Sequence, residues 1–136
     1  MMWWNNYVGI PFKCDGRDRS GADCYGLVAL IYQEQLGIEL NLFNGVFINQ
    51  SFSCLKNVAR VMEDEREKWE RVEKPIVFDV ILLRFSEYVW HCGVIIGNKK
   101  MIHVMTGINS CIENYNSITW RQRVAEFRRY KNHSFA

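Results

Sequence analysis

The 136-residue chain contains no uninterrupted apolar run approaching the ~20 residues that span a bilayer, so we expect no membrane insertion. Its opening residues, M-M-W-W-N-N-Y, have neither the basic segment nor the apolar core of a secretory signal peptide. The formal net charge of +2 lies too near balance to indicate a nucleic acid as partner. We therefore expect synthesis in the cytoplasm, with delivery by another component if the protein acts outside the cell.

The cysteines also lack the arrangement of a disulfide framework or a zinc site. Their number is odd and no two form a C-x-x-C pair; they are Cys14, Cys24, Cys54, Cys92 and Cys111. Such a set favours a reducing compartment. No pair among Cys24, His91, His103 and Cys111 has the spacing of zinc ligands. We expect neither a metal nor a cofactor.

Nothing in the sequence marks a linker, an internal repeat or a low-complexity segment, so we predict a single domain over residues 1–136. Hydrophobic residues make up 49% of the chain, which is enough to bury a core without metal or disulfide. Residues 3–12 suggest an extended segment packed against the body, and residues 13–22 a polar loop.

Two helices are predicted in the first half of the chain. The first begins at Cys24, keeps an apolar face and stops at Gly37. The second is expected over residues 51–72, where apolar residues recur at three and four positions and Pro75 follows.

The periodicity changes after Pro75 to short, β-branched runs. They predict strands at residues 80–85, 92–97, 101–105, 110–115 and 124–130, with a tight turn at residues 97–100. Helices followed by strands at hairpin spacing indicate an α+β domain, in which the helices pack on a small antiparallel sheet.

Cys24 is the candidate nucleophile. Ser20 and Asp23 are both good helix-capping residues, which places Cys24 in the first turn of the first helix. The exposed N–H groups and the positive end of the helix dipole favour a thiolate there, so we expect a lowered pKa for Cys24. The backbone N–H of Cys24 is a candidate donor to an oxyanion.

His91 and His103 are the candidate partners of this thiol. They flank one predicted hairpin, so neighbouring strands could bring both imidazoles to one end of the sheet. His91 would act as the base and His103 would orient it. Cys92 points to the opposite face of the strand from His91 and belongs to the core. The alternative is that the cysteine and both histidines have only structural roles. His133 lies in a polar tail and is assigned no role.

Three motifs resemble those of the NlpC-type cell-wall cysteine peptidases. The nucleophile motif D-C-[SW]-G-[LF]-V corresponds to D-C-Y-G-L-V at 23–28, and H-x-G-[IV] corresponds to H-C-G-V at 91–94. The stretch M-I-H-V at 101–104 matches the strand that follows in the family, and F-D-V at 78–80 keeps two residues of G-D-[VL]. This order over roughly residues 7–130 is far more specific than one short motif.

The phage-encoded members of that family are the most similar. They typically carry G-x-P-[FY] and G-R-D before the cysteine, as at residues 9–12 and 16–18 here, and C-[WY]-G as at 24–26. The resemblance implies a papain-like domain that cuts peptidoglycan from a phage or prophage tail. Phage tail proteins are then the expected partners, and the tail would deliver the enzyme to the cell wall.

The resemblance further implies the substrate and its contacts. The expected substrate is the peptide stem of peptidoglycan, cut at the bond between D-glutamate and a diamino acid. Asp23 would bind the substrate's amine, although a helix cap is an equal alternative for it, and Tyr25 would line the substrate site. Phe12 stands where many members have a tyrosine, so that hydroxyl is absent.

Two other functions fit the same residues. One is a phage tail-tip protein that retains the fold for assembly without using the active site. The other is an acyltransferase or amidase of the same superfamily, which would use the thiol and histidine on a different acyl donor.

Overall fold

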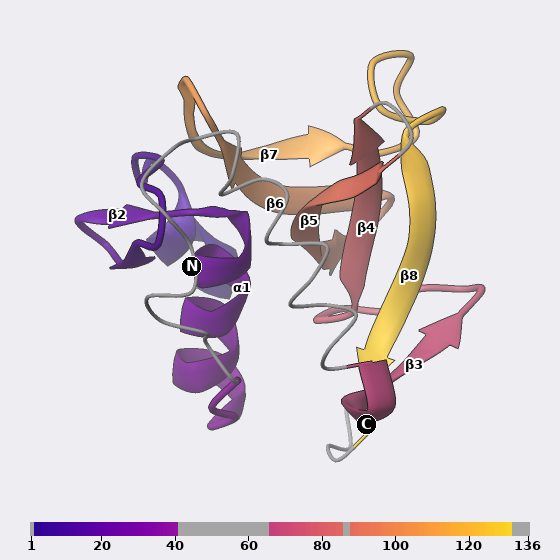
Figure 1. The fold of residues 1–136 in the computed structure, drawn as a ribbon, viewed down its shortest axis with the longest axis horizontal. Coiled ribbons are helices and arrows are strands. Elements are labelled where there is room, and N and C mark those ends of the chain that lie inside the picture. Colours follow the sequence, from indigo (N-terminus) through magenta and orange to yellow (C-terminus); the bar gives the residue numbers. More distant parts are fainter. Residues whose placement is uncertain (1, 41–65, 86–87, 132–136) are drawn as a thin grey trace.

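One six-stranded sheet organises the chain in the computed structural model, which describes residues 2–40, 66–85 and 88–131. Every neighbouring pair in it is antiparallel. In spatial order the strands are β3 (Trp69–Val72), β8 (Val124–Tyr130), β4 (Val80–Phe85), β5 (Tyr88–Gly97), β6 (Lys100–Met105) and β7 (Ile108–Asn114). The four strands β4 to β7 are neighbours in chain order, and β8 returns to pair with β4 (Figure 1). The predicted strands and the α+β class are confirmed.

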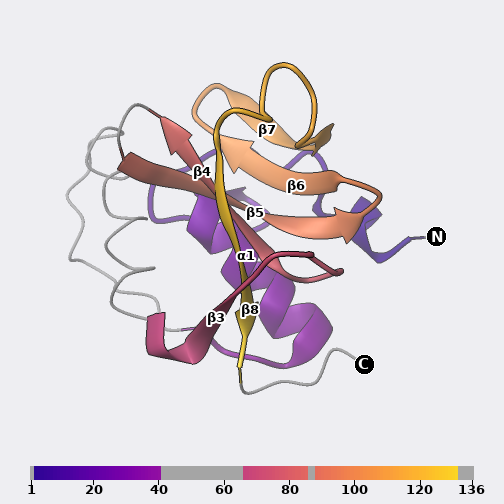
Figure 2. The ribbon, with the colours of Figure 1, turned by 90° about the vertical axis from the view of Figure 1, so that its right-hand side faces the viewer.

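The helix α1 (Cys24–Ile31) packs on one face of this sheet and lies behind it in Figure 2. All eight of its residues are buried, which explains its uniformly apolar sequence after Cys24. It continues into η2 (Tyr32–Leu36), a π-helical turn that ends at Gly37, whose φ of 68° suits glycine. The predicted stop at Gly37 is confirmed. Within the described parts of the chain, no helix is long and apolar enough to cross a membrane.

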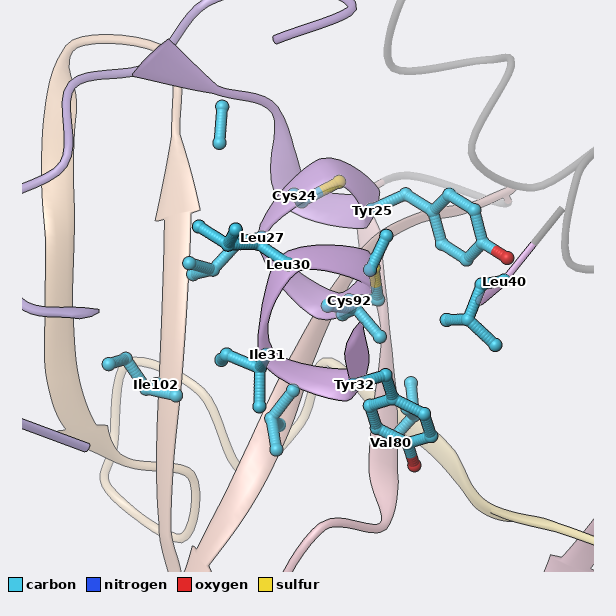
Figure 3. Close-up of a cluster of buried hydrophobic side chains, with 14 of the residues drawn as sticks. Cys24, Tyr25, Leu27, Leu30, Ile31, Tyr32, Leu40, Val80, Cys92 and Ile102 are labelled. Atoms are coloured by element: carbon cyan, nitrogen blue, oxygen red, sulfur yellow. The ribbon is translucent and has the colours of Figure 1, made fainter. Parts of the chain in front are cut away.

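Buried side chains form a cluster on each face of the sheet. The larger cluster fills the space between α1 and the sheet and includes Leu27, Ile31, Val94 and Ile102 (Figure 3). The smaller cluster lies on the opposite face; its buried members are Ile81, Leu83, Ile95, Met101 and Trp120. Because side chains alternate along a strand, each residue of β5 belongs to one face or the other.

The N-terminal segment differs from its prediction. Its first part forms a 3₁₀ helix, η1 (Trp3–Tyr7), rather than extended chain. The turn lets Trp3 stack on Phe78 with 4.7 Å between ring centroids while Tyr7 is fully buried. The predicted loop that follows contains two short paired strands, β1 (Arg17–Asp18) and β2 (Gly21–Ala22).

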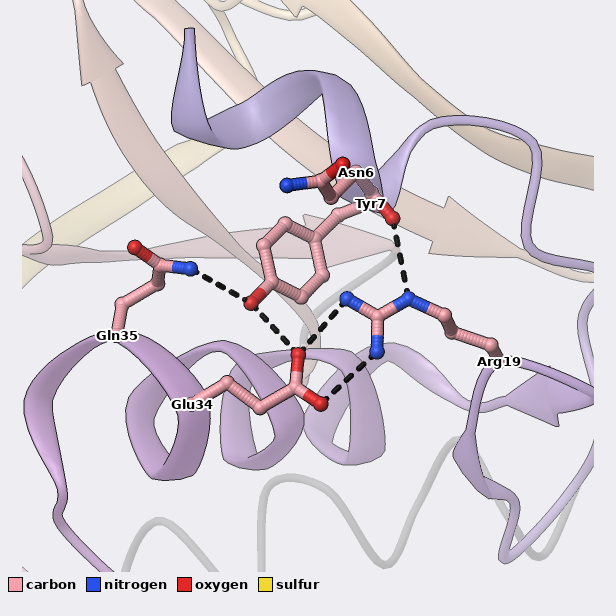
Figure 4. A network of polar contacts seen from close by, with 5 residues as sticks. All are labelled: Asn6, Tyr7, Arg19, Glu34 and Gln35. Atoms are coloured by element: carbon pink, nitrogen blue, oxygen red, sulfur yellow. Dashed lines mark hydrogen bonds and ion pairs between the residues drawn. The ribbon is translucent and has the colours of Figure 1, made fainter.

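A polar network ties these pieces together (Figure 4). The Tyr7 hydroxyl donates to Glu34 at 2.8 Å and accepts from the side chain of Gln35 at 3.0 Å. Arg19, in the turn between β1 and β2, donates through both terminal nitrogens to the same carboxylate, each at 2.8 Å. Its Nε also donates to the backbone carbonyl of Asn6. Residues from η1, the β1–β2 turn and η2 are thereby fixed against one another.

The second predicted helix is wrong over its last four residues. Residues 66–68 form the short 3₁₀ helix η3 (Arg66–Lys68), and Trp69–Val72 are strand β3, which pairs with the end of β8. Trp69 is buried against Tyr130 and Tyr32, at centroid distances of 5.2 and 5.6 Å. This aromatic packing outweighs the helical spacing of the local sequence. Residues 51–65, with Cys54, and His133 lie outside the described residues.

Candidate active site

The first turn of α1 is built by Asp23. Its Oδ1 accepts from the backbone N–H of Gly26 at 2.6 Å, and its Oδ2 accepts from the N–H of Asp15 at 3.0 Å. The backbone of Asp23 is extended, as at a regular N-cap. Cys24 is therefore the first residue of the helix, where the sequence predicted it. The structure gives Asp23 the capping role of its two predicted roles, and its side chain is largely enclosed, because the residue is 8% exposed.

Close approach of two glycines sets the position of this turn. A Cβ placed on Gly26 would lie 2.0 Å from the carbonyl oxygen of Gly16, and one placed on Gly16 would lie 2.3 Å from that of Gly21. Real Cβ atoms do not approach so closely, so only glycine fits at either position. The glycine two residues after the cysteine in the motif thus lets the loop before β1 pack against the helix.

The thiol of Cys24 lies in the core rather than in an open cleft. The residue is 2% exposed, and Cys92 on β5 is the neighbour that most affects its thiol. Figure 3 shows both side chains within the larger buried cluster. The hydrogen bond with Cys92, burial, and the negative charge of Asp23 raise the pKa of Cys24 well above its usual value.

The expected lowering of the Cys24 pKa is therefore wrong for this state of the protein. The helix N-terminus does favour a thiolate, but it acts here on a sulfur that is out of water and next to another thiol and a carboxylate. Near neutral pH the resting form is the protonated thiol. Cys92 itself is in the core, as predicted, and lies in the cluster between α1 and the sheet.

His91 and His103 do come together, on the opposite face of the sheet. The Nε2 of His91 lies 2.7 Å from the Nδ1 of His103, and both residues are almost fully buried. Gly93 makes room for this pair, because a Cβ on it would lie 3.1 Å from the Cβ of His103. The Trp120 indole covers both rings, stacked on His91 and edge-on to His103. The prediction that the hairpin brings the two imidazoles together is confirmed.

Burial keeps both imidazoles neutral. Burial, followed by repulsion from His103 whenever that ring is protonated, holds the pKa of His91 well below its usual range. Burial also lowers the pKa of His103, although the neighbouring Glu113 carboxylate opposes that effect. A neutral imidazole can accept a proton, so His91 is in the form that a general base requires at neutral pH.

Glu113 completes the chain of polar groups and was missed by the sequence analysis. Its Oε2 lies 2.6 Å from the Nε2 of His103. Burial by itself would raise the pKa of Glu113, but hydrogen bonds from Trp120 and His103 have the larger combined effect. The net result is a lowered pKa, so the side chain is a carboxylate. No motif points to Glu113, since it is one of many acidic residues and only the pairing of β6 with β7 brings it to His103.

The carboxylate fixes the tautomers of both histidines. Glu113 accepts a hydrogen bond, so His103 carries its proton on Nε2 and its Nδ1 is an acceptor. His91 must then donate from Nε2 to that nitrogen, which leaves Nδ1 of His91 as the atom that could take a proton. The arrangement can therefore accept a proton at one defined atom.

The thiol and the chain of histidines both approach β5. Cys92, which contacts Cys24, faces α1, whereas the adjacent residue His91 faces Trp120. The helix N-terminus and the histidine pair thus meet β5 at successive residues but on its two faces. The assignment of Cys24 as nucleophile, His91 as base and His103 as orienting residue stays a prediction.

Tyr25 is placed in the core. It is 5% exposed and belongs to the larger buried cluster, with its ring near Leu40 in Figure 3. Its role in substrate binding stays a prediction, because the buried side chain offers little surface to a ligand.

The sequence and the fold were compared with known proteins. The NlpC/P60 family matches residues 9–129, which is most of the chain. The chain belongs to the NlpC/P60 family. The match includes the helix that begins at Cys24 and the strands that carry His91 and His103.

Curated relatives of this NlpC/P60 chain are bacterial. The chain is 25% identical over 131 residues to the murein DD-endopeptidase MepS/murein LD-carboxypeptidase of Escherichia coli K12. It is 23% identical over 128 residues to a probable endopeptidase NlpC homolog of Haemophilus influenzae. These alignments cover 95% and 93% of the chain but only 60% and 58% of the relatives, so the chain spans about three fifths of their length.

Solved structures share the fold at lower sequence identity. The NlpC/p60 domain of the peptidoglycan hydrolase SagA is 15% identical with a TM-score of 0.60, over 90% of this chain and 89% of that one. An NLP/P60 family protein of Staphylococcus aureus is 18% identical with a TM-score of 0.67, over 94% of this chain and 39% of that one. At such identity the likeness supports the papain-like α+β fold alone.

Proposed function

We propose that this NlpC/P60 chain is a cysteine peptidase that hydrolyses peptide bonds in the stem peptides of bacterial peptidoglycan. The observation that carries the proposal is the row of hydrogen bonds from His91 through His103 to the Glu113 carboxylate. His91 is adjacent in sequence to Cys92, the residue on β5 that lies beside Cys24. Membership of the family and the names of the curated relatives support the substrate class.

In the proposed reaction the Cys24 thiol attacks the carbonyl carbon of the scissile peptide bond as its proton passes to Nδ1 of His91. His103 and Glu113 hold His91 in the required tautomer and stabilise the imidazolium that forms. The backbone N–H of Cys24, at the first position of α1, is a donor to the oxyanion. His91 returns the proton to the leaving amine, and water then hydrolyses the thioester.

The proposed reaction starts from a neutral pair rather than a preformed ion pair. The raised pKa of Cys24 and the lowered pKa of His91 both favour the thiol and the neutral imidazole. Attack therefore requires the thiol to exchange its position beside Cys92 for a hydrogen bond with Nδ1 of His91. We expect substrate binding to drive this exchange, since it supplies contacts that the free protein lacks.

The finer assignment is the bond between D-glutamate and a diamino acid, with Asp23 and Tyr25 contacting the substrate. The resemblance of residues 9–12 and 16–18 to phage-encoded members supports action from a phage or prophage tail. Mass spectrometry of tail particles from the producing strain, with and without prophage induction, tests that location. Absence of the chain from purified tails would contradict it.

The decisive experiment incubates wild type and the Cys24→Ala and His91→Ala variants with defined muropeptides. New free amines are then followed by mass spectrometry, and Cys14→Ala serves as the matched cysteine control. We expect product from wild type and Cys14→Ala only. Absence of product from wild type would contradict the peptidase proposal, whereas product from Cys24→Ala would contradict the nucleophile.

Masses of the products identify the bond. Cleavage after D-glutamate gives a new amine on the diamino acid. Cleavage of a cross-link between two stems gives two unlinked stems instead. Added amine nucleophiles test for acyl transfer: capture of the acyl group in preference to water would favour the acyltransferase alternative.

A further inference from the structure

A second cluster of chemically reactive side chains lies at the outer end of the histidine chain. His103, Cys111 and Glu113 place their ligand atoms within 4.8 Å of one another. The Cys111 sulfur lies 4.0 Å from Nε2 of His103 and 3.8 Å from Oε2 of Glu113. Imidazole nitrogen, thiol sulfur and carboxylate oxygen are the three donor types that zinc binds in proteins.

The pairing of β6 with β7 builds this cluster. His103 and Cys111 are direct cross-strand partners, so their side chains share one face of the sheet. Glu113 is two residues further along β7 and therefore points to that same face. The sequence predicted no metal because no pair among Cys24, His91, His103 and Cys111 has zinc-ligand spacing. Only the register of the two strands brings Glu113 to His103 and Cys111.

We propose that His103, Cys111 and Glu113 form a zinc site. Zn–N and Zn–O bonds of about 2.1 Å and a Zn–S bond of about 2.3 Å require donor separations of about 3.4 to 3.6 Å in a tetrahedron. The two sulfur distances need to shorten by a few tenths of an ångström, and the 2.6 Å separation of His103 and Glu113 needs to open by less than 1 Å. Side-chain rotation of two half-exposed residues, Cys111 and Glu113, can supply such changes.

The surroundings of the cluster suit an entering ion. The Glu113 side chain is 35% exposed and Cys111 is partly exposed, so the ion has a path from solvent and a water can fill the fourth position. The buried ligand, His103, already has its other ring nitrogen held by His91 at 2.7 Å. Metal-binding histidines usually have such a partner on their second nitrogen, because it fixes the ring for coordination.

Zinc at this site would switch the histidine pair to the wrong tautomers for catalysis, a consequence that rests on the proposed function. A zinc ion on Nε2 of His103 moves the ring proton to Nδ1, which then donates to Nε2 of His91. The proton of His91 moves to its Nδ1, so that atom can no longer accept a proton from Cys24. Cys111 releases its thiol proton to solvent when it binds the ion. Bound zinc is therefore inhibitory.

Cobalt(II) titration tests the site without any need for activity. We expect one equivalent of Co²⁺ to give a thiolate-to-cobalt charge-transfer band in wild type and in the Cys14→Ser variant. Cys14 is the other partly exposed cysteine among the residues that the structure describes. Cys111→Ser is expected to lose the band and Cys24→Ala to retain it. No band in wild type, or an equal band in Cys111→Ser with a native circular dichroism spectrum, would overturn the site.

Inhibition is measured separately on the muropeptide reaction. We expect Zn²⁺ to inhibit wild type reversibly, with recovery on adding a chelator. Cys111→Ser should keep the zinc-free rate and need more than about tenfold more zinc for half-inhibition, since it loses a direct ligand. Full activity of the zinc-loaded wild type would overturn the inhibitory role. Inactive wild type without zinc would count against the proposed function alone, because the cobalt result stands by itself.

Discussion

Oε2 of Glu113 lies 2.6 Å from Nε2 of His103, so a carboxylate closes the chain of hydrogen bonds that begins at His91. An ionised acceptor at this end admits one tautomer of each histidine and stabilises positive charge that develops on them. The two imidazoles alone would not fix which nitrogen of His91 carries the proton. The pair thus depends on a residue that lies ten positions from His103 and belongs to no motif.

Replacing Glu113 by Gln should lower the rate of muropeptide hydrolysis by about tenfold or more. An amide can face His103 with its N–H₂ group and so favour the wrong tautomer, and it carries no charge to stabilise an imidazolium. The loss should be large because a positioned general base contributes about 10²–10⁴-fold to rate. The measurement is kcat at saturating substrate, with Glu70→Gln on the exposed edge strand as the control. An unchanged kcat in Glu113→Gln would show that the carboxylate does not set the tautomers.

Replacing Cys92 by Ala should lower the pKa of Cys24. The hydrogen bond with Cys92 is the largest cause that raises this pKa, and the substitution removes it. In wild type the rate of alkylation of Cys24 by iodoacetamide should rise with pH above the free-thiol pKa of about 8.5, because only the thiolate reacts. In Cys92→Ala the midpoint should shift to lower pH. A wild-type midpoint at or below about 8.5 would contradict the protonated resting state.

Replacing Gly26 by Ala should destabilise the protein although alanine is the better helix former. Propensity alone favours alanine by about 1 kcal/mol. The added methyl group would lie 2.0 Å from the Gly16 carbonyl oxygen, and overpacking of this kind costs about 1–3 kcal/mol or more. Urea denaturation measures the change in the free energy of unfolding.

Gly107→Ala is the matched control for that measurement. Gly107 has a φ of 81°, but no atom would lie within 4 Å of a Cβ added there, so its substitution reports backbone strain without steric overlap. Unchanged stability in Gly26→Ala would show that the Gly16 carbonyl does not exclude a side chain at residue 26.

Two arginines that each donate two hydrogen bonds to one carboxylate should contribute unequally to stability. Arg129 donates through Nε and Nη2 to the two oxygens of Asp79, at 2.9 and 2.8 Å, and the Asp79 side chain is fully buried. Arg19 makes a similar pair with Glu34, but there both side chains are more than a third exposed. We expect Arg129→Met to cost at least about 2 kcal/mol, because it leaves a buried charge without its partner.

Arg19→Met should cost within about 1 kcal/mol, as exposed ion pairs do. Urea unfolding of both variants at one pH gives the comparison directly. A larger loss in Arg19→Met than in Arg129→Met would show that burial of the acceptor does not decide the value of these pairs.

The strands from residue 80 onward could be read from the sequence, because short β-branched runs with turns between them leave few alternatives. The start of α1 was equally readable, since Asp23 caps it through its own neighbours. Trp69–Val72 could not be assigned in this way. Its helical spacing is local, whereas its pairing with β8 and the burial of Trp69 against Tyr130 involve residues some sixty positions away.

The sequence was enough to indicate the family and the fold class and to predict Cys24, His91 and His103 as the reactive residues, because each lies in a short motif whose neighbours have local roles. Tertiary structure alone decided what surrounds them. Burial against Cys92 reversed the expected shift of the Cys24 pKa, and the pairing of β6 with β7 brought Glu113 and Cys111 to His103. Proton affinity and metal binding depend on burial and on atoms a few ångströms away, and only the folded chain sets both.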